Sequence, residues 1–268
     1  MRWARTAASV GMWAALATTF AFVAIPVAAL LTANSPSALV HQLGSAEARD
    51  ALVLSLECSA IALLIVILFG TPTAWLLATR RFKGRSLAIT MVELPLVLPP
   101  AVAGIALLAA FGPLGTLGGV EDALGVKLVL ETAGVVVALV FVSAPFHIRQ
   151  AEAAFSAINP SILEASRTLG ASDPRTFIRV AIPTAMPALA AGATLAFARA
   201  LGEFGATLMF AGSLRGVTQT APLAIYEGFG TNLAGSEALA AVLVAAAAAL
   251  LLTMRLLTKR WTQANVPL

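Results

Sequence analysis

The sequence predicts an all-α membrane protein with six transmembrane helices, because of its composition, its long apolar runs and the placement of its basic residues. Of the 268 residues, 59% are hydrophobic and only 11% are charged. A soluble globular domain usually has about 25% charged residues, so we expect the lipid bilayer to surround most of this chain. The apolar runs extend from one end of the sequence to the other, which indicates a single transmembrane domain over residues 1–268.

The predicted transmembrane helices are apolar runs of the length that a bilayer requires, about 20 residues. The first run follows Arg2 and Arg5 and resembles a secretory signal, but it is longer than the roughly 7–15 apolar residues of such a signal. We therefore expect it to remain in the protein as a helix. The six runs are Trp13–Leu31, Leu52–Ala78, Leu87–Phe111, Leu128–Phe146, Pro187–Gly212 and Glu237–Leu257.

The basic residues lie in alternate connections between these runs. The segment Thr79–Arg85 has four basic residues and no acidic one. If this segment and the N-terminus are cytoplasmic, six crossings also place Arg149–Arg179 and the C-terminal tail in the cytoplasm. The cytoplasmic parts then hold thirteen basic residues, the outer connections hold three, and Arg199 lies within a run. This asymmetry follows the positive-inside rule, so we expect a multi-pass protein with both termini cytoplasmic.

The remaining charge and motif patterns exclude several functions. The net charge is +4, but the basic residues form short clusters rather than one polar face, so nucleic acid is not an expected partner. The chain has no Gly-x-x-x-x-Gly-Lys-Ser/Thr phosphate-binding loop and no His-Glu-x-x-His or Gly-x-Ser-x-Gly motif. His41 and His147 fall on opposite sides of the predicted membrane, and Cys58 is the only cysteine. We therefore predict no catalytic residue, metal site or cofactor site in this chain.

The outer connections are acidic or polar, and this pattern has two interpretations. They are ordinary solvated loops, or they form a docking surface whose charges guide an extracytoplasmic partner. The third outer segment, Ser213–Gly235, is long for a tight turn, and we expect it to fold back along the membrane surface. The acidic residues are Glu47 and Asp50 in the first connection, Glu121 and Asp122 in the second, and Glu227 in the third.

The cytoplasmic connection between the fourth and fifth runs has strong local signals for two short helices. Asn159 is a good N-cap residue and Pro160 suits the first helical position. Gly170 can adopt the left-handed conformation that ends a helix. Asp173 and Pro174 then repeat the cap-and-proline pattern before the chain enters the membrane. The residues alone are equally compatible with an ordinary connector and with a helix that docks on a partner.

This connection resembles the EAA signature of permeases in binding-protein-dependent ABC importers. That signature reads Glu-Ala-Ala, three residues, Gly, nine residues, Ile, one residue, Leu-Pro. The spacing is kept here, with Ser, Val and Ile replacing the second Ala, the Ile and the Leu. The resemblance implies a type I ABC importer permease fold and a coupling loop at about residues 147–183, in which Glu164–Gly170 contacts an ATP-hydrolysing subunit. The matching residues are Glu164, Ala165, Ser166, Gly170, Val180, Ile182 and Pro183.

A second stretch, Phe197–Gly212, resembles the penultimate helix of molybdate/tungstate permeases, which are relatives of sulfate/thiosulfate permeases. The resemblance implies a prokaryotic cell-membrane subunit that imports a tetrahedral oxyanion. Molybdate or tungstate is favoured, and sulfate or thiosulfate remains the alternative. It also implies a second copy of this chain, two ATP-binding cassette subunits with ATP-Mg, and an extracytoplasmic oxyanion-binding protein. An ion-coupled secondary transporter is a more remote alternative, since it would need inverted repeats that the sequence does not show.

Two charged residues lie near the middle of the fifth run. Arg199 and Glu203 are four residues apart, which places them on one face of a continuous helix. Charges at this depth usually face the bundle interior and pair with one another. They form either a structural ion pair or a pair beside the translocation pathway. We assign Arg199, Gly202, Glu203 and Gly205 to the predicted pathway.

Overall fold

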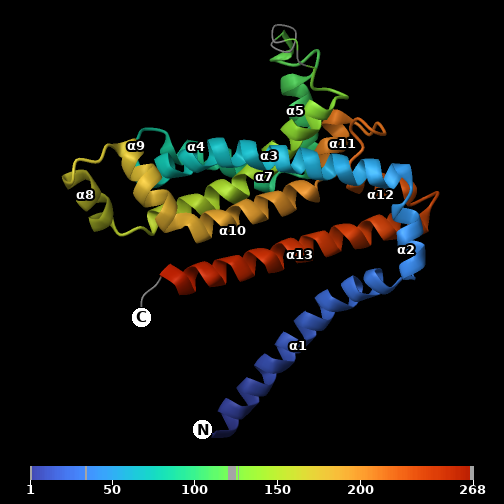
Figure 1. Cartoon of the computed structure of the whole chain (residues 1–268), viewed down its shortest axis with the longest axis horizontal. Helices are drawn as coiled ribbons and strands as arrows, with labels where there is room; N and C mark the ends of the chain where they lie inside the picture. The colour runs from blue at the N-terminus through green and yellow to red at the C-terminus, as the bar shows by residue number, and fades with distance from the viewer. Residues whose placement is uncertain (1, 34, 120–124, 126, 266–268) are drawn as a thin grey trace.

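Helices account for all the regular structure that is described. A computed structural model describes residues 2–33, 35–119, 125 and 127–265, and within them the chain forms no strand (Figure 1). The all-α prediction is therefore confirmed. The helices are α1 (Arg2–Thr32), α2 (Pro36–Leu43), α3 (Ala46–Thr79), α4 (Arg85–Val97), α5 (Pro100–Phe111), α7 (Thr132–Ser156), α8 (Pro160–Thr168), α9 (Asp173–Thr176), the π-helix η1 (Phe177–Ala181), α10 (Ile182–Leu201), α11 (Gly205–Ala211), α12 (Ala221–Gly228) and α13 (Leu233–Asn265).

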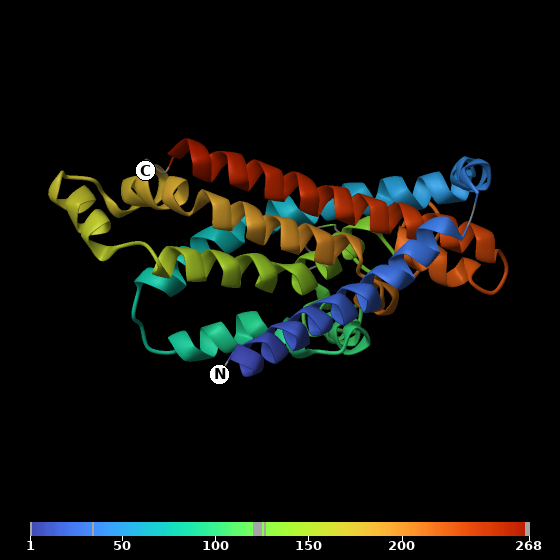
Figure 2. The same ribbon diagram turned by 90° about the horizontal axis from the view of Figure 1, so that it is seen from below.

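The centre of the bundle consists of α3, α7 and α10, which lie side by side with α13 along them (Figure 2). Small residues fill the contact between these helices. Cys58 and Ala62 of α3 are fully buried against Leu139 of α7 and Ala200 of α10. Small side chains let helix backbones approach closely, and in lipid such packing replaces the hydrophobic effect as the source of association. Cys58 thus serves as a small buried residue in this contact.

The third predicted transmembrane run is not one continuous helix. The chain leaves helical geometry at Leu98 (φ −69°, ψ 132°) and Pro99 (φ −55°, ψ 137°), and α5 begins at Pro100. Two consecutive prolines explain the break, because a residue that precedes proline is driven out of the α region. Five helices in the described parts of the chain are long and apolar enough to span a membrane. The third predicted run, Leu87–Phe111, corresponds instead to α4 and the shorter apolar α5.

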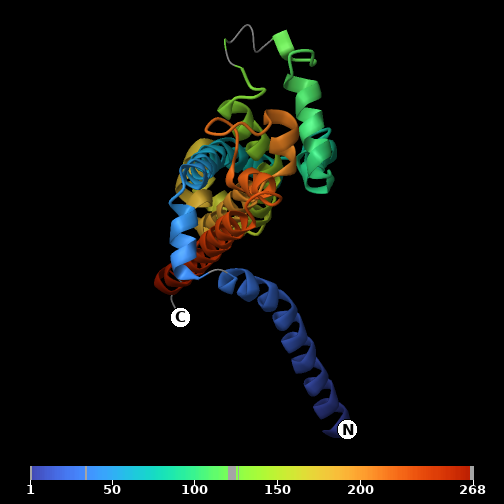
Figure 3. The same cartoon turned by 90° about the vertical axis from the view of Figure 1, so that its right-hand side faces the viewer.

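The first helix lies apart from the bundle. Within α1, the apolar stretch Gly11–Thr32 is long enough to cross a bilayer, and none of its most apolar window is buried. Figures 1 and 3 show α1 leaning away from the other helices. An apolar helix in this position is stable only when its surroundings are themselves apolar.

Connections between the long helices lie at opposite ends of the bundle, whereas the chain after α5 extends away from it, at the top of Figure 1. At one end, Arg80 of the basic segment pairs with Asp173 of the predicted coupling loop. At the other end, the Asn232 amide donates to Gln42 at 3.4 Å. This grouping confirms that the predicted cytoplasmic connections share one end. Glu121 and Asp122, which we assigned to the outer end, lie outside the described residues.

The third outer segment was predicted to fold back along the membrane surface, but it packs into the bundle. The backbone N–H of Ala221 donates to Ser55 Oγ of α3 at 2.7 Å. Leu223 is fully buried and Ala224 nearly so. The apolar face of α12 is covered because it packs between α3 and α13, which leaves the polar Glu227 at the outer surface.

Candidate functional site: the coupling loop and a buried ion pair

The helix α8 begins and ends where its sequence predicted. Asn159 Oδ1 accepts a hydrogen bond from the backbone N–H of Ser161 at 3.0 Å, and Pro160 is the first helical residue. At the other end, Gly170 has φ +81°, and its N–H donates to the Arg167 carbonyl at 2.9 Å. The left-handed conformation predicted for Gly170 is confirmed. No residue of α8 is fully buried, so the faces of the helix away from Leu163, which packs against the bundle, are available to a partner.

The next short helix begins differently from the prediction. Ser172, with extended backbone geometry, is the N-cap of α9, and Asp173 is already helical. The Asp173 carboxylate instead pairs with Arg80 and, at 3.4 Å, with Arg167. This arrangement is favourable because an acid in the first turn also offsets the positive end of the helix dipole. Asp173 thus attaches the coupling loop to the basic segment that follows α3.

Beyond α9 the chain widens into the π-helix η1 just before Pro183. A proline inside a helix removes one backbone donor and crowds the carbonyl four residues earlier, which a wider turn accommodates. Phe177 of η1 packs against Trp75 of α3, with ring centroids 5.6 Å apart, and against Phe155 of α7 at 6.0 Å. The loop is therefore joined to two long helices through an aromatic cluster.

The residues that match the EAA signature have different surroundings. Glu164 and Ala165 are exposed, and Glu164 forms no ion pair with any described residue. Ser166, where the signature has alanine, lies 3.0 Å from the Thr176 hydroxyl, a hydrogen bond that ties α8 to α9. No local pattern predicts this bond, because the two residues come together only after the turn at Gly170 has formed.

The ion pair predicted between Arg199 and Glu203 is present, but the helix around it is broken. The run Pro187–Gly212 was expected to be continuous, whereas α10 ends at Leu201 and α11 begins at Gly205. Glu203 is 1% exposed, and its Oε1 accepts a hydrogen bond from the Ala206 N–H at 2.7 Å. Glu203 therefore pairs with Arg199 and also caps α11.

Close packing of α5 accompanies this break. A Cβ added to Gly205 would lie 2.7 Å from the Cβ of Pro100, and one added to Gly104 would lie 2.6 Å from the Ala206 carbonyl oxygen. The glycines thus allow the start of α5 to approach the start of α11. The two broken runs meet each other at their breaks, since Pro100 opens α5 and Gly205 opens α11.

Two further buried polar groups were missed by sequence reasoning. His147 is 1% exposed, and its Nε2 lies 2.8 Å from the Thr71 hydroxyl. Glu152 is also buried, and it pairs with Arg149 and, at 3.2 Å, with Arg85. The spacing of Arg149 and Glu152 by three residues was the available signal for their pairing.

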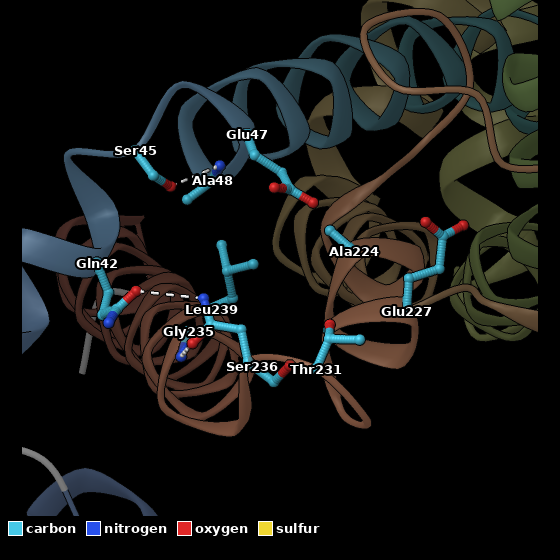
Figure 4. Close-up of a pocket in the computed structure, with 12 residues that line it drawn as sticks. Gln42, Ser45, Glu47, Ala48, Ala224, Glu227, Thr231, Gly235, Ser236 and Leu239 are labelled. Carbon is cyan, nitrogen blue, oxygen red and sulfur yellow. Dashed lines mark hydrogen bonds between the residues drawn. The ribbon is translucent and has the colours of Figure 1, made fainter.

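A polar pocket lies at the end of the bundle opposite to α8, between the start of α3 and the α12–α13 turn (Figure 4). Its volume is about 210 Å³, and its walls include the carboxylates of Glu47 and Glu227. Gln219 Nε2 donates to Glu227 at 2.7 Å, and Arg215 is 3.9 Å from Glu47. The pocket brings together acidic residues from the first and third outer connections, which are far apart in the sequence.

Residues 67–267 match the family described as binding-protein-dependent transport system inner membrane component. The match covers most of the chain, including the EAA-like loop and the buried ion pair. The chain belongs to this family. Membership confirms the resemblance to binding-protein-dependent permeases that the residues of the loop predicted.

Comparison with individual proteins is more specific than the family match. The chain is 39% identical over 231 residues to the molybdenum transport system permease protein ModB of Mycobacterium tuberculosis, covering 86% of this chain and 88% of that protein. It is 35% identical over 193 residues to the sulfate transport system permease protein CysW of Synechococcus elongatus, covering 72% and 68% respectively.

The fold has a counterpart among solved structures. A chain of a bacterial ABC transporter involved in the import of the acidic polysaccharide alginate superposes with a TM-score of 0.74 over 99% of both chains, at 19% identity. This likeness concerns the fold, which is that of a type I ABC importer permease. The chain is therefore a multi-pass permease subunit of an ABC transporter.

Proposed function

We propose that this permease imports molybdate or tungstate into the cytoplasm, as the membrane-spanning part of an ATP-driven complex. The observation that supports this substrate is the 39% identity to ModB over most of both chains. The resemblance of Phe197–Gly212 in this chain to the penultimate helix of molybdate/tungstate permeases supports the same substrate. Sulfate or thiosulfate is the second candidate, favoured by the identity to CysW, since all these ions are tetrahedral oxyanions.

In the proposed complex, two copies of the chain associate with two ATP-binding subunits inside and an oxyanion-binding protein outside. ATP-Mg is bound and hydrolysed by the partner subunits. Closure of those subunits moves the coupling loops, rocks the two permeases and opens the pathway toward the loaded binding protein. Residues 1–268 act as a single transmembrane domain, with both termini cytoplasmic.

The residues proposed to couple ATP hydrolysis to transport lie in the loop at about 147–183. The exposed α8 and the carboxylate of Glu164, which no described residue neutralises, are suited to contact a partner. Ala165 and Ser166 lie along α8, Gly170 sets the direction in which the chain leaves it, and Pro183 begins the return to the membrane. The aromatic contacts of Phe177 provide a mechanical connection from this loop to α3 and α7.

The proposed translocation pathway includes Arg199, Gly202, Glu203 and Gly205. Arg199 is 29% exposed, so its guanidinium has room for a dianion beside Glu203. Glu203 partly offsets the positive charge, which favours release, because transport requires binding weak enough for exit. The break at Gly202–Gly205 places this pair at the contact between α5 and α11.

The outer surface proposed to receive the binding protein includes the pocket between Glu47 and Glu227. Its acidic side chains would guide a basic surface of that protein during encounter.

Cysteines placed at Lys83 and Gly119 test the orientation of the chain in the membrane. An impermeant thiol reagent added outside should label the cysteine at 119 and spare the one at 83. Labelling of position 83 in intact cells would contradict the orientation.

Uptake into proteoliposomes tests the substrate. Complexes of this permease with its cognate ATP-binding subunit and binding protein should accumulate radiolabelled molybdate only with ATP. Unlabelled tungstate should compete at lower concentration than sulfate. Stronger competition by sulfate than by tungstate would favour the second candidate, and uptake without ATP would favour a secondary transporter.

A further inference from the structure

The connection between α3 and α4, residues 80–85, is a basic turn with no acidic residue. Its four basic residues are Arg80, Arg81, Lys83 and Arg85. The first and the last of them have partners within the protein. Arg80 pairs with Asp173. Arg85 pairs with Glu152 at 3.2 Å and donates to the Leu77 carbonyl at 2.8 Å. These two contacts fix both ends of the basic turn against the bundle.

The two basic side chains in the middle of the turn have no such contacts. Arg81 and Lys83 are exposed, and neither forms an ion pair with any described residue. Phe82, which lies between them in the sequence, is also exposed. Gly84, with φ +89°, then turns the chain into α4. The basic turn thus has an uncompensated charge of two and an exposed aromatic ring.

An apolar stripe on α4 begins directly after the basic turn. It consists of Leu87, Met91 and Leu94, which are all exposed and follow the i, i+4, i+7 spacing of one helical face. The helix α4 lies along one side of the bundle, next to α7, and none of its residues is fully buried (Figures 2 and 3). Because α4 belongs to an apolar run of a membrane protein, we expect hydrocarbon to cover this stripe.

We propose that the basic turn and the apolar stripe together bind an anionic phospholipid. Its phosphate and headgroup lie on Arg81 and Lys83, and one acyl chain runs along the stripe from Leu87 toward Leu94. Charge complementarity supports this occupant, because basic clusters next to a transmembrane helix attract anionic lipids. The exposed ring of Phe82 then lies at the boundary between headgroups and acyl chains, where aromatic side chains are favourable. The inference goes beyond the proposed function, since it does not depend on the transported substrate.

Native mass spectrometry of the full-length permease in detergent micelles with added lipid tests the proposal. The probes are phosphatidylglycerol and phosphatidylcholine with identical acyl chains. Wild type should bind phosphatidylglycerol about tenfold or more tightly, because each basic residue near an anionic headgroup contributes about fivefold in affinity. The double variant Arg81→Gln, Lys83→Gln should lose this preference. Arg81→Lys should retain most of it, since the charge is kept.

A second pair of exposed basic residues provides the matched control. The double variant Arg49→Gln, Lys127→Gln removes the same charge from the predicted outer connections, and it should retain the preference for phosphatidylglycerol. Met91→Gln places a polar group in the apolar stripe and should weaken the binding of both lipids by a similar factor. The thermal unfolding midpoints of all variants should agree with that of wild type, because every substituted side chain is exposed.

Several outcomes would overturn the proposal. The first is equal binding of the two lipids by wild type, and the second is an unchanged preference in the double variant of Arg81 and Lys83. An equal loss in the outer control would indicate general attraction of anions. Displacement of the lipid by phosphate or molybdate, but not by chloride at equal ionic strength, would assign the basic turn to free oxyanions. A disulfide-linked dimer of Met91→Cys without bound lipid would assign the stripe to a second copy of the chain.

Discussion

The coupling loop and the break in the fifth transmembrane run both interrupt helices, but by opposite means. In the loop, Asn159 and Gly170 specify the ends of α8 locally, and no side chain of this helix is fully buried. At the break, a buried carboxylate caps α11 while pairing with Arg199. A helix can thus be interrupted by local backbone preference at a wet surface, or by a buried charge supported by its packing.

This difference implies a difference in energetic cost. The ion pairs of Asp173 are about half exposed on both partners, and such pairs contribute roughly 0–1 kcal/mol. Glu203 is almost fully buried, and removing one partner from a buried pair typically costs about 3–5 kcal/mol. Single substitutions of paired charges should therefore lower stability more at the membrane-embedded break than in the coupling loop.

The largest expected effect is on the buried pair. Arg199→Ala or Glu203→Ala should each destabilise the permease by about 3–5 kcal/mol, because each leaves an uncompensated charge. The double variant should recover most of this loss. Recovery should fall short by about 1 kcal/mol, since the α11 cap is still missing. Thermal unfolding in detergent measures all three, with Glu164→Ala as the exposed control. A double variant no more stable than either single one would refute the pairing.

Close packing beside the break should give the next effect. Gly104→Ala brings a methyl group against the Ala206 carbonyl, a contact of 2.6 Å before relaxation, and overpacking of this kind costs about 1–3 kcal/mol. Gly11→Ala is a matched control, because nothing lies within 4 Å of its added Cβ. It should be neutral or slightly stabilising. Equal unfolding temperatures for the two variants would contradict the packing of α5 on α11.

In the coupling loop, Gly170→Val should strain the turn by roughly 1–3 kcal/mol, since a β-branched residue is forced into the left-handed region. Gly170→Asn should be tolerated, because asparagine visits that region readily. We expect the valine variant to insert normally, lose binding of the ATP-binding subunit and stop transport. Co-purification of the subunit measures the binding. Wild-type transport by the valine variant would contradict the coupling assignment.

The smallest effect is expected at Asp173. Asp173→Asn removes the pairs with Arg80 and Arg167, and it should lower stability by no more than about 1 kcal/mol. The difference from wild type should shrink in high salt, because exposed charges are screened. Unfolding midpoints at about 0.05 M and 0.5 M salt test this. A large loss of stability that does not depend on salt would contradict this prediction, because it would mean that solvent does not screen the ion pairs of Asp173.

The same contrast explains which features the sequence could predict. Hydropathy located the five described helices that are long and apolar enough to span a membrane, and caps and a glycine located α8, because these signals are local. The break at Pro99 also had a local signal, the two consecutive prolines. Hydropathy averaged over a window of residues does not register this signal. The break after Gly202 had none that was decisive. It depends on packing of α5 at Gly205, and on a carboxylate that finds its N–H partner only in the folded chain.

Parallel assays of ATP hydrolysis and molybdate uptake by reconstituted complexes test most directly whether the two regions have separate roles. Our proposal predicts that Gly170→Val loses both activities, because the ATP-binding subunit is no longer engaged. The double variant Arg199→Ala, Glu203→Ala should bind the subunit and hydrolyse ATP while its molybdate uptake changes by several-fold. Loss of ATP hydrolysis in the double variant together with normal hydrolysis in Gly170→Val would contradict the assignment of both regions.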